Sequence, residues 1–255
     1  MQNTNFSPRS STAGQTSRGR YAKLFANSPI KAAELVYSQL SLYMPRQELA
    51  RLLFLAEIYR EKVVDTTGVL MELGTCWGRT AALLTNMRGI FEPYNFTRRL
   101  IVFDTFEGLR GTSKEDGGHE LAKDGTYSTG AAYEDHLAAV LAYHESESPI
   151  AHIKKHEIIK GDASETLPNY LRQHPETIVA MAYVDFDIYK PTRACLEALR
   201  PHLTKRSVLV FDQLNCPEYP GETVALREVF GLSAGSLVRS PITPWMSYMV
   251  CDGIA

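Results

Sequence analysis

Five short segments rich in β-branched and other apolar residues recur along the chain, and helix-forming stretches separate them. These segments are Val69–Leu73, Leu100–Phe103, Glu157–Lys160, Ile178–Val184 and Ser207–Phe211. Each is too short for a globular helix and is bounded by turn-forming or charged residues, which is typical of a buried strand. Strands that alternate with helices form parallel βαβ units, and strands that are apolar throughout require helices on both faces of the sheet. The sequence therefore predicts an α/β fold with a doubly wound, mostly parallel, Rossmann-like sheet.

Two further strands are expected near the C-terminus, at Ser236–Arg239 and Met246–Val250. The turn between them carries Pro241 and Pro244, and so short a connection joins antiparallel strands. This C-terminal antiparallel hairpin brings the predicted sheet to seven strands.

The chain before the first strand divides into two parts. Residues 1–20 are rich in small and polar side chains with almost no large apolar ones, so we expect a flexible tail. Residues 21–66 carry two helical patterns, Ile30–Ser41 and Pro45–Val63. They would form an N-terminal helical cap over the core or a lid over a site, and both interpretations stay open. Residues 67–255 would form the main domain.

Composition limits the class of partner. The chain is 44% hydrophobic and 22% charged, which is ordinary for a globular protein, and its formal net charge of -2 provides no broad basic field for nucleic acid. A small molecule is the expected partner, and assembly into a homo-oligomer stays open. The four cysteines show no C-x-x-C spacing, which predicts reduced thiols and a cytoplasmic location. No apolar run approaches the roughly 20 residues of a membrane span.

Acids and glycines follow the predicted strands where each strand ends. In parallel sheets of this kind, ligands bind beyond the carboxyl ends of the strands. The residues that fall there are Gly74, Asp104, Asp162, Asp185, Asp187 and Asp212. Carboxylates gathered at one edge repel one another unless cations or hydrogen-bond donors neutralise them. Helix capping alone does not explain so many acids, and this edge is the predicted site.

The residues that follow the first three predicted strands indicate a nucleoside-like ligand. Gly74 and Gly78 lack a Cβ, so the backbone can approach a ligand, and the helix that follows favours an anionic group such as a carboxylate. Asp104 holds the position whose acid accepts ribose hydroxyls. Asp162 would accept from an adenine amine or cap a helix. The chain lacks G-x-G-x-x-G here, which argues against NAD.

The residues that follow the last two parallel strands indicate a metal site. Asp185 and Asp212 end adjacent strands, and Gln213 adds an amide oxygen, which together suit a hard cation such as Mg²⁺. Asp187 lies two residues after Asp185 on the same edge, where it would take a proton or cap the next helix. The polar, glycine-rich segment Glu107–Thr129 is longer than a loop that only joins two elements of secondary structure. We therefore expect it to be functional and mobile.

Five motifs together resemble those of the macrocin O-methyltransferase (TylF-type) family, and the resemblance extends from about Gly68 to Phe230. They are Glu72-Leu73-Gly74-x-x-x-Gly78, Phe103-Asp104-Thr105-Phe106-Glu107-Gly108-Leu109, Gly161-Asp162-Ala163-x-x-Thr166-Leu167-Pro168, Asp185-Phe186-Asp187-Ile188-Tyr189-x-x-Thr192 and Phe211-Asp212-Gln213. Members of that family are class I, metal-dependent methyltransferases that use S-adenosylmethionine and act on sugar hydroxyls of natural products.

The resemblance implies a role for each matched position. It implies cofactor contacts from Glu72, Gly74, Thr75, Gly78, Asp104, Thr105, Asp162, Ala163 and Asp185. It also implies Mg²⁺ ligation by Asp185, Asp212 and Gln213, with Asp187 as general base. The sequence departs from the family pattern at two places. The family usually has a second acid where Gln213 stands. After Tyr189, Lys190-Pro191 replaces the acid and small polar residue that are common in the family. Two other functions stay open at this stage, an NAD-dependent oxidoreductase and a cofactor-binding protein without transferase activity.

Overall fold

The computed structural model describes residues 12–252, which divide into two compact units. The first unit ends at Leu49 and the second begins at Ala50.

The first unit is helical. It contains α1 (Thr12–Ala26), α2 (Ala32–Ser38) and the 3₁₀ turn η1 (Leu40–Tyr43). The ring of Phe25 packs edge-on against that of Tyr43, with centroids 5.3 Å apart. Residues 12–20, expected to belong to a flexible tail, lie in α1 instead, because this stretch contains helix-favouring Ala, Gln and Arg and no proline. The rest of that predicted tail lies outside the described residues.

The second unit begins inside helix α3 (Arg46–Ile58), which continues into the π-helical turn η2 (Tyr59–Val63). Phe54, Leu55 and Ile58 of α3 are buried in the same apolar cluster as the strands. The boundary therefore falls earlier than the expected residue 67. The apolar face of α3 recurs at helical spacing and packs on the sheet, so this helix belongs to the main core.

A seven-stranded sheet forms the centre of the second unit, in the order β3-β2-β1-β4-β5-β7-β6. The strands are β1 (Val69–Leu73), β2 (Leu100–Asp104), β3 (His156–Lys160), β4 (Val179–Val184), β5 (Leu203–Phe211), β6 (Gly235–Arg239) and β7 (Ser247–Cys251). β1 to β5 pair in parallel, while β7 pairs antiparallel with both β5 and β6. The predicted mostly parallel sheet with a C-terminal antiparallel hairpin is confirmed.

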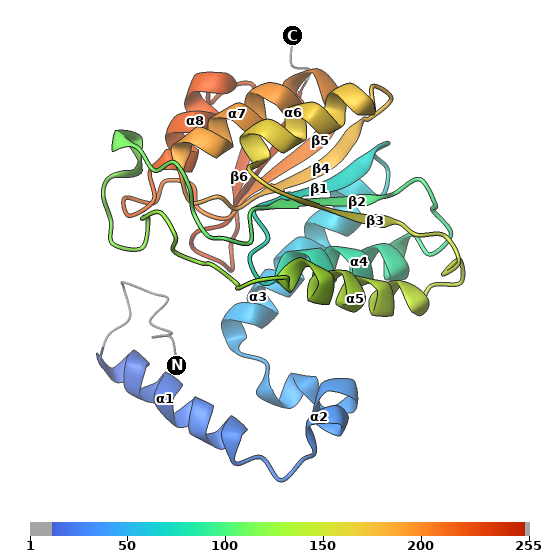
Figure 1. Ribbon diagram of the computed structural model, residues 1–255, viewed down its shortest axis with the longest axis vertical. Coiled ribbons are helices and arrows are strands. Elements are labelled where there is room, and N and C mark those ends of the chain that lie inside the picture. The colour runs from blue at the N-terminus through green and yellow to red at the C-terminus, as the bar shows by residue number, and fades with distance from the viewer. Residues whose placement is uncertain (1–11, 253–255) are drawn as a thin grey trace. The chain divides into compact units, whose positions relative to one another are not determined.

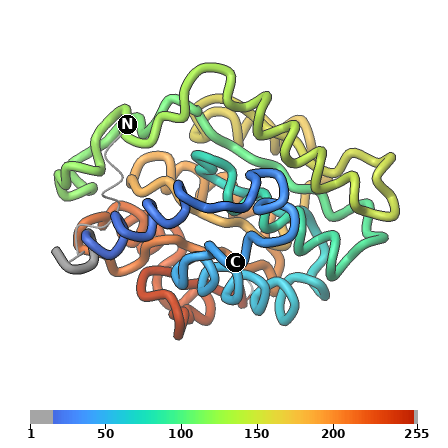
Figure 2. The backbone as a smooth tube through the Cα atoms, turned by 90° about the horizontal axis from the view of Figure 1, so that it is seen from below, coloured from blue at the N-terminus to red at the C-terminus, as the bar shows by residue number. Residues whose placement is uncertain are grey.

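Helices cover both faces of the sheet (Figure 1). On one face lie α3, α4 (Arg79–Phe91) and α5 (Tyr133–Ser146), with α4 and α5 as neighbours (Figure 2). On the other lie α6 (Ala163–Gln173), α7 (Tyr189–Leu199) and α8 (Gly221–Val229). In β1, β2 and β5, successive apolar residues enter opposite clusters, as Leu70 packs with α3 to α5 and Met71 with α6 to α8. Both faces of the central strands β1, β2 and β4 are buried, and this explains why these strands are largely apolar.

Along residues 12–252, no helix combines the length and the apolar character that a membrane span requires. All four cysteines of the sequence are unpaired thiols, as expected.

Candidate active site

The turn after β1 contains the two predicted glycines, and contacts within the protein require both. Gly74 has a φ of +85°, and a Cβ there would lie 2.2 Å from the carbonyl oxygen of Asp185. Gly78 has a φ of +77°, and a Cβ there would lie 2.1 Å from Cδ1 of Leu137 on α5. The first glycine lets the ends of β1 and β4 approach each other, and the second lets α4 pack against α5. Their predicted role toward a cofactor remains a prediction.

Asp104 at the end of β2 organises two turns. Its Oδ2 accepts hydrogen bonds from the backbone N–H groups of Thr75 at 2.7 Å and Cys76 at 2.8 Å, and its Oδ1 accepts from that of Phe106 at 2.6 Å. Cys76 and Phe106 both have positive φ, at 49° and 58°, so these contacts stabilise backbone that is unfavourable for side chains. A carboxylate offers about four acceptor positions, and a ribose hydroxyl can still bind there. Thr105 lies beside it and accepts from the N–H of Glu107 at 3.1 Å.

Glu72 lies at the carboxyl end of β1 and is 1% exposed. Its Oε2 has no hydrogen-bond partner in the described chain, and neither has the buried Oγ1 of nearby Thr75. Burial, above all, raises the pKa of Glu72 to about 8. Such an oxygen fits a ligand that brings a positively charged donor, such as the ammonium group of an amino acid.

Asp162 precedes α6 and caps it. Its Oδ1 accepts hydrogen bonds from the N–H of Ser164 at 2.9 Å and from the Oγ of Ser164 at 2.6 Å. Ala163 is the first residue of that helix and is 4% exposed. The capping interpretation of Asp162 therefore applies, and contact with an adenine remains a prediction.

Three acids converge beyond β4. Carboxylate oxygens of Asp185, Asp187 and Glu222 lie within 4.8 Å of one another. Asp187 is 7% exposed and has a φ of +62°, and Glu222 on α8 is fully buried. Oε1 of Glu222 accepts from the backbone N–H of Asp187 at 3.2 Å, and Oε2 accepts from that of Gln213 at 3.3 Å. The sequence analysis assigned Glu222 no role.

Asp212 is neutralised by a residue that sequence reasoning also missed. Nη2 of Arg51, on α3, donates to Oδ1 of Asp212 at 2.6 Å, and the hydroxyl of Tyr183 donates to the same oxygen at 2.6 Å. Nη1 of Arg51 also donates to that hydroxyl. All three side chains are buried. The only sequence signal for this contact is an arginine within the apolar pattern of a helix.

The acid cluster carries more negative charge than this arginine can neutralise. Burial and the charge of Asp212 raise the pKa of Asp187 to about 7, while burial and neighbouring acids raise the pKa values of Asp185 and Glu222. Oδ1 of Asp187 and Oε1 of Gln213 are buried without a hydrogen-bond partner in the part of the chain that the structure describes. Clustered acids with unpartnered oxygens fit a hard divalent cation, which would replace the protons that they otherwise retain.

The long segment after β2 is tied to this site. Asp116 is 1% exposed, and its Oδ2 accepts from the N–H of Ser113 at 2.7 Å. Its Oδ1 accepts from the N–H of Tyr189, the first residue of α7, at 2.6 Å. This contact caps α7, and Asp187 does not cap it. Further along, the hydroxyls of Tyr127 and Tyr219 lie 3.1 Å apart. Burial and the charge of Asp187 raise the pKa of Tyr127.

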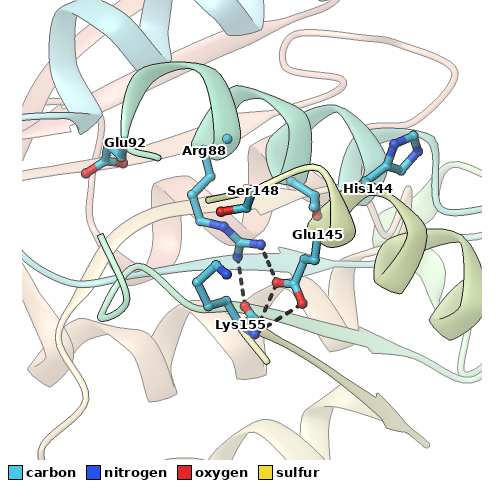
Figure 3. Close-up of a pocket in the computed structure, with 8 residues that line it drawn as sticks. Arg88, Glu92, His144, Glu145, Ser148 and Lys155 are labelled. Carbon is cyan, nitrogen blue, oxygen red and sulfur yellow. Dashed lines mark hydrogen bonds and ion pairs between the residues drawn. The ribbon is translucent and has the colours of Figure 1, made fainter. Parts of the chain in front are cut away.

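A pocket between α4 and α5 is a different kind of feature (Figure 3). Arg88 and Glu145 point toward each other there and form an ion pair, and Arg88 also donates to the carbonyl oxygen of Lys155 at 2.8 Å. Lys155 immediately precedes β3, so this pocket lies at the amino end of that strand, away from the acids. Its charged groups satisfy one another, and we interpret it as structural.

Comparison with known proteins identifies the family. A family model described as a methyltransferase domain matches residues 71–214, more than half of the chain. The chain belongs to this methyltransferase family. In a crystal structure, the calicheamicin methyltransferase CalS11 is 38% identical, with 94% of this chain and 93% of that chain covered and a TM-score of 0.89. An apo structure described as CalS11, a TDP-rhamnose 3'-O-methyltransferase of calicheamicin biosynthesis, is 37% identical, with coverages of 94% and 95% and a TM-score of 0.81.

A third structure supports the fold alone. The O-methyltransferase NovP is 18% identical, with 80% of this chain and 81% of that chain covered and a TM-score of 0.62. Among curated protein sequences, none matches this methyltransferase significantly.

Membership in the family confirms the class predicted from the sequence motifs, a class I methyltransferase that uses S-adenosylmethionine. It leaves no support for an NAD-dependent oxidoreductase. The narrower macrocin-type resemblance remains a prediction, as do the individual roles of the site residues.

Proposed function

We propose that this methyltransferase transfers the methyl group of S-adenosylmethionine to a hydroxyl of a sugar, carried on a nucleotide or on a glycosylated natural product, with the help of Mg²⁺. The observation that carries the proposal is the unpartnered, buried Oδ1 of Asp187 beside Asp185 and Glu222. An acceptor hydroxyl needs both a proton acceptor and charge stabilisation, and this cluster offers both. The similarity to CalS11, described as acting on TDP-rhamnose, supports a sugar nucleotide as the acceptor.

The cofactor would bind across the ends of β1, β2 and β3. Glu72 would accept from the methionine ammonium, and the turn of Gly74, Thr75 and Gly78 would border the carboxylate. Asp104 with Thr105 would contact the ribose, and Asp162 with Ala163 the adenine. The unpartnered oxygens of Glu72 and Thr75 support this placement, because a bound ammonium group would supply the missing donor.

Asp185, Asp212 and Gln213 would hold the cation. A bound Mg²⁺ supplies charge that lowers the pKa of a hydroxyl and stabilises its alkoxide. Asp187 would accept the hydroxyl proton, because its buried Oδ1 has no hydrogen-bond partner in the described chain. The acceptor O–H bond breaks, an O–CH₃ bond forms, and the C–S bond of the cofactor breaks to leave S-adenosylhomocysteine.

The surroundings of the site would assist this chemistry. The segment around Tyr127 and Tyr219 would restrict water near Asp187. The unpaired thiols support a cytoplasmic location.

Methyl transfer to TDP-rhamnose tests the proposal directly. We expect mass spectrometry to show a product heavier by one CH₂, formed only with S-adenosylmethionine, abolished by EDTA and restored by Mg²⁺. Calorimetric titration should show binding of S-adenosylhomocysteine and none of NAD. Full activity after EDTA and exhaustive dialysis would exclude the metal requirement. Cofactor binding without transfer to any sugar nucleotide or glycoside would instead favour a binding protein without transferase activity.

A further inference from the structure

The proposed cation site has an amide instead of a carboxylate at position 213. Gln213 stands where a second acid is expected from the sequence resemblance, so the set Asp185, Asp212 and Gln213 contains only two carboxylates. One of these, Asp212, already shares its Oδ1 with the guanidinium of Arg51 and the hydroxyl of Tyr183. A neutral amide and a partly neutralised acid would bind a divalent cation weakly.

Glu222 lies where an additional carboxylate could bind the proposed cation. Its carboxylate lies between the end of β4 and the end of β5, where it accepts from the N–H groups of Asp187 and Gln213. The start of α8 fixes this position, because a Cβ on Gly221 would lie 2.3 Å from Oδ1 of Asp116 and 2.5 Å from the N of Tyr189. The glycine lets α8 begin against these groups, with Glu222 fully buried beside the site.

The hydrogen bonds from the backbone N–H groups of Asp187 and Gln213 do not by themselves explain why Glu222 is buried here. Both contacts are long, at 3.2 and 3.3 Å, and the carboxylate faces other acids. Three acids packed within 4.8 Å repel one another when charged, and such an arrangement destabilises the fold unless something neutralises it. Asp187 is 7% exposed as a residue, and its buried, unpartnered Oδ1 adds an acceptor to the same cluster.

We propose that Glu222 is a cation ligand of this methyltransferase, and that it supplies from α8 the carboxylate that Gln213 lacks. The inference rests on the proposed function, in which the site holds a divalent cation. Asp185 and Glu222 would both hold the cation, since their carboxylate oxygens lie within 4.8 Å of each other.

Binding of Mn²⁺ alone, followed by electron paramagnetic resonance and calorimetry, tests this without any activity measurement. Glu222→Gln should weaken Mn²⁺ binding by at least about 10-fold. Gln213→Glu in that background should restore the affinity to within a few-fold of the wild type, since it returns one carboxylate to the proposed ligand set. Glu228→Gln, on the exposed side of the same helix, is the matched control and should bind like the wild type.

Two results would overturn the inference while leaving the proposed function intact. One is an unchanged Mn²⁺ affinity in Glu222→Gln, and the other is a double variant that binds no better than Glu222→Gln. If Glu222→Gln fails to fold, Glu222→Asp retains the charge and withdraws it by one methylene. Wild-type affinity in Glu222→Asp would then overturn the assignment. A wild-type protein that binds no Mn²⁺ would overturn this inference together with the metal requirement.

Discussion

Arg51 on α3 and Asp212 at the end of β5 form a buried ion pair, with Nη2 and Oδ1 2.6 Å apart. This pair connects a helix that precedes the sheet to an acid of the candidate site. It also means that Asp212 is partly neutralised before any metal binds.

Replacing Arg51 by Met should destabilise the protein by about 3 to 5 kcal/mol, because it leaves Asp212 buried without its cation. Combining Arg51→Met with Asp212→Asn should recover part of that loss, since the second change removes the unpaired charge. Denaturant unfolding of the single and double variants measures both effects. Tyr183→Phe, which removes one hydrogen bond to the same oxygen, should cost only about 1 kcal/mol. A loss below that of Tyr183→Phe would show that the ion pair is unimportant.

Glu72→Gln should stabilise the protein without cofactor in a pH-dependent way. The native protein retains a proton on Glu72 up to its pKa of about 8, whereas the unfolded chain loses it near 4.5. The wild-type free energy of unfolding therefore falls as the pH rises through this window. The variant lacks this loss, so its advantage should grow to the order of a few kcal/mol at pH 8. Urea unfolding at pH 5 and pH 8 measures this difference, and an equal difference at both pH values would contradict the assignment.

Asp187→Asn should reduce the turnover of methyl transfer by about 10²- to 10⁴-fold, the usual cost of removing a general base. Binding of S-adenosylhomocysteine should stay close to that of the wild type. Single-turnover kinetics with TDP-rhamnose at saturating Mg²⁺ isolates the chemical step. A normal rate would remove Asp187 from proton transfer.

Asp104→Ala should weaken cofactor binding and also lower the stability, because three backbone N–H groups lose their acceptor at about 1 to 3 kcal/mol for each unsatisfied group. An analogue of S-adenosylhomocysteine without ribose hydroxyls separates the two effects. If Asp104 accepts from those hydroxyls, the variant should lose more affinity for S-adenosylhomocysteine than for the analogue. Equal losses in calorimetric titration would limit Asp104 to holding the turns.

Hydrogen exchange should divide the segment Glu107–Thr129 into two classes. The amides near Asp116 should be protected without ligand, because this buried acid joins the segment to the start of α7. The remaining amides should become protected when S-adenosylhomocysteine and the sugar nucleotide bind. Asp116→Asn should reduce the first protection without preventing the second. Identical exchange in all states would make the segment a passive insertion.

The sequence predicted the sheet well because each strand carries its own local signal. Apolar runs that end in Gly74, Asp104 or Asp185 mark both the strands and the edge where the acids gather, and the structure places them there. The C-terminal hairpin had similar local signals in its prolines and β-rich segments.

The residues that the sequence did not reveal act through long-range contacts. Arg51 meets Asp212, and Glu222 meets Asp187, although they lie far apart along the chain. Each occurs on a helix whose pattern predicts only a helix, so no local signal distinguishes a buried charge from an exposed one. Asp116 lies in a polar segment, where no local signal distinguishes its buried carboxylate from exposed polar side chains.

Helix α3 has a consequence for trimming the protein. It begins at Arg46 in the first unit, and its later residues belong to the core of the second. Shortened chains that start at Pro45 keep the whole helix and with it the guanidinium beside Asp212. A start only a few residues later, beyond Arg51, would leave that acid unpaired while most of the sheet and its helices remain encoded. Library design and crystallisation trials should therefore treat residue 45 as the last safe starting point.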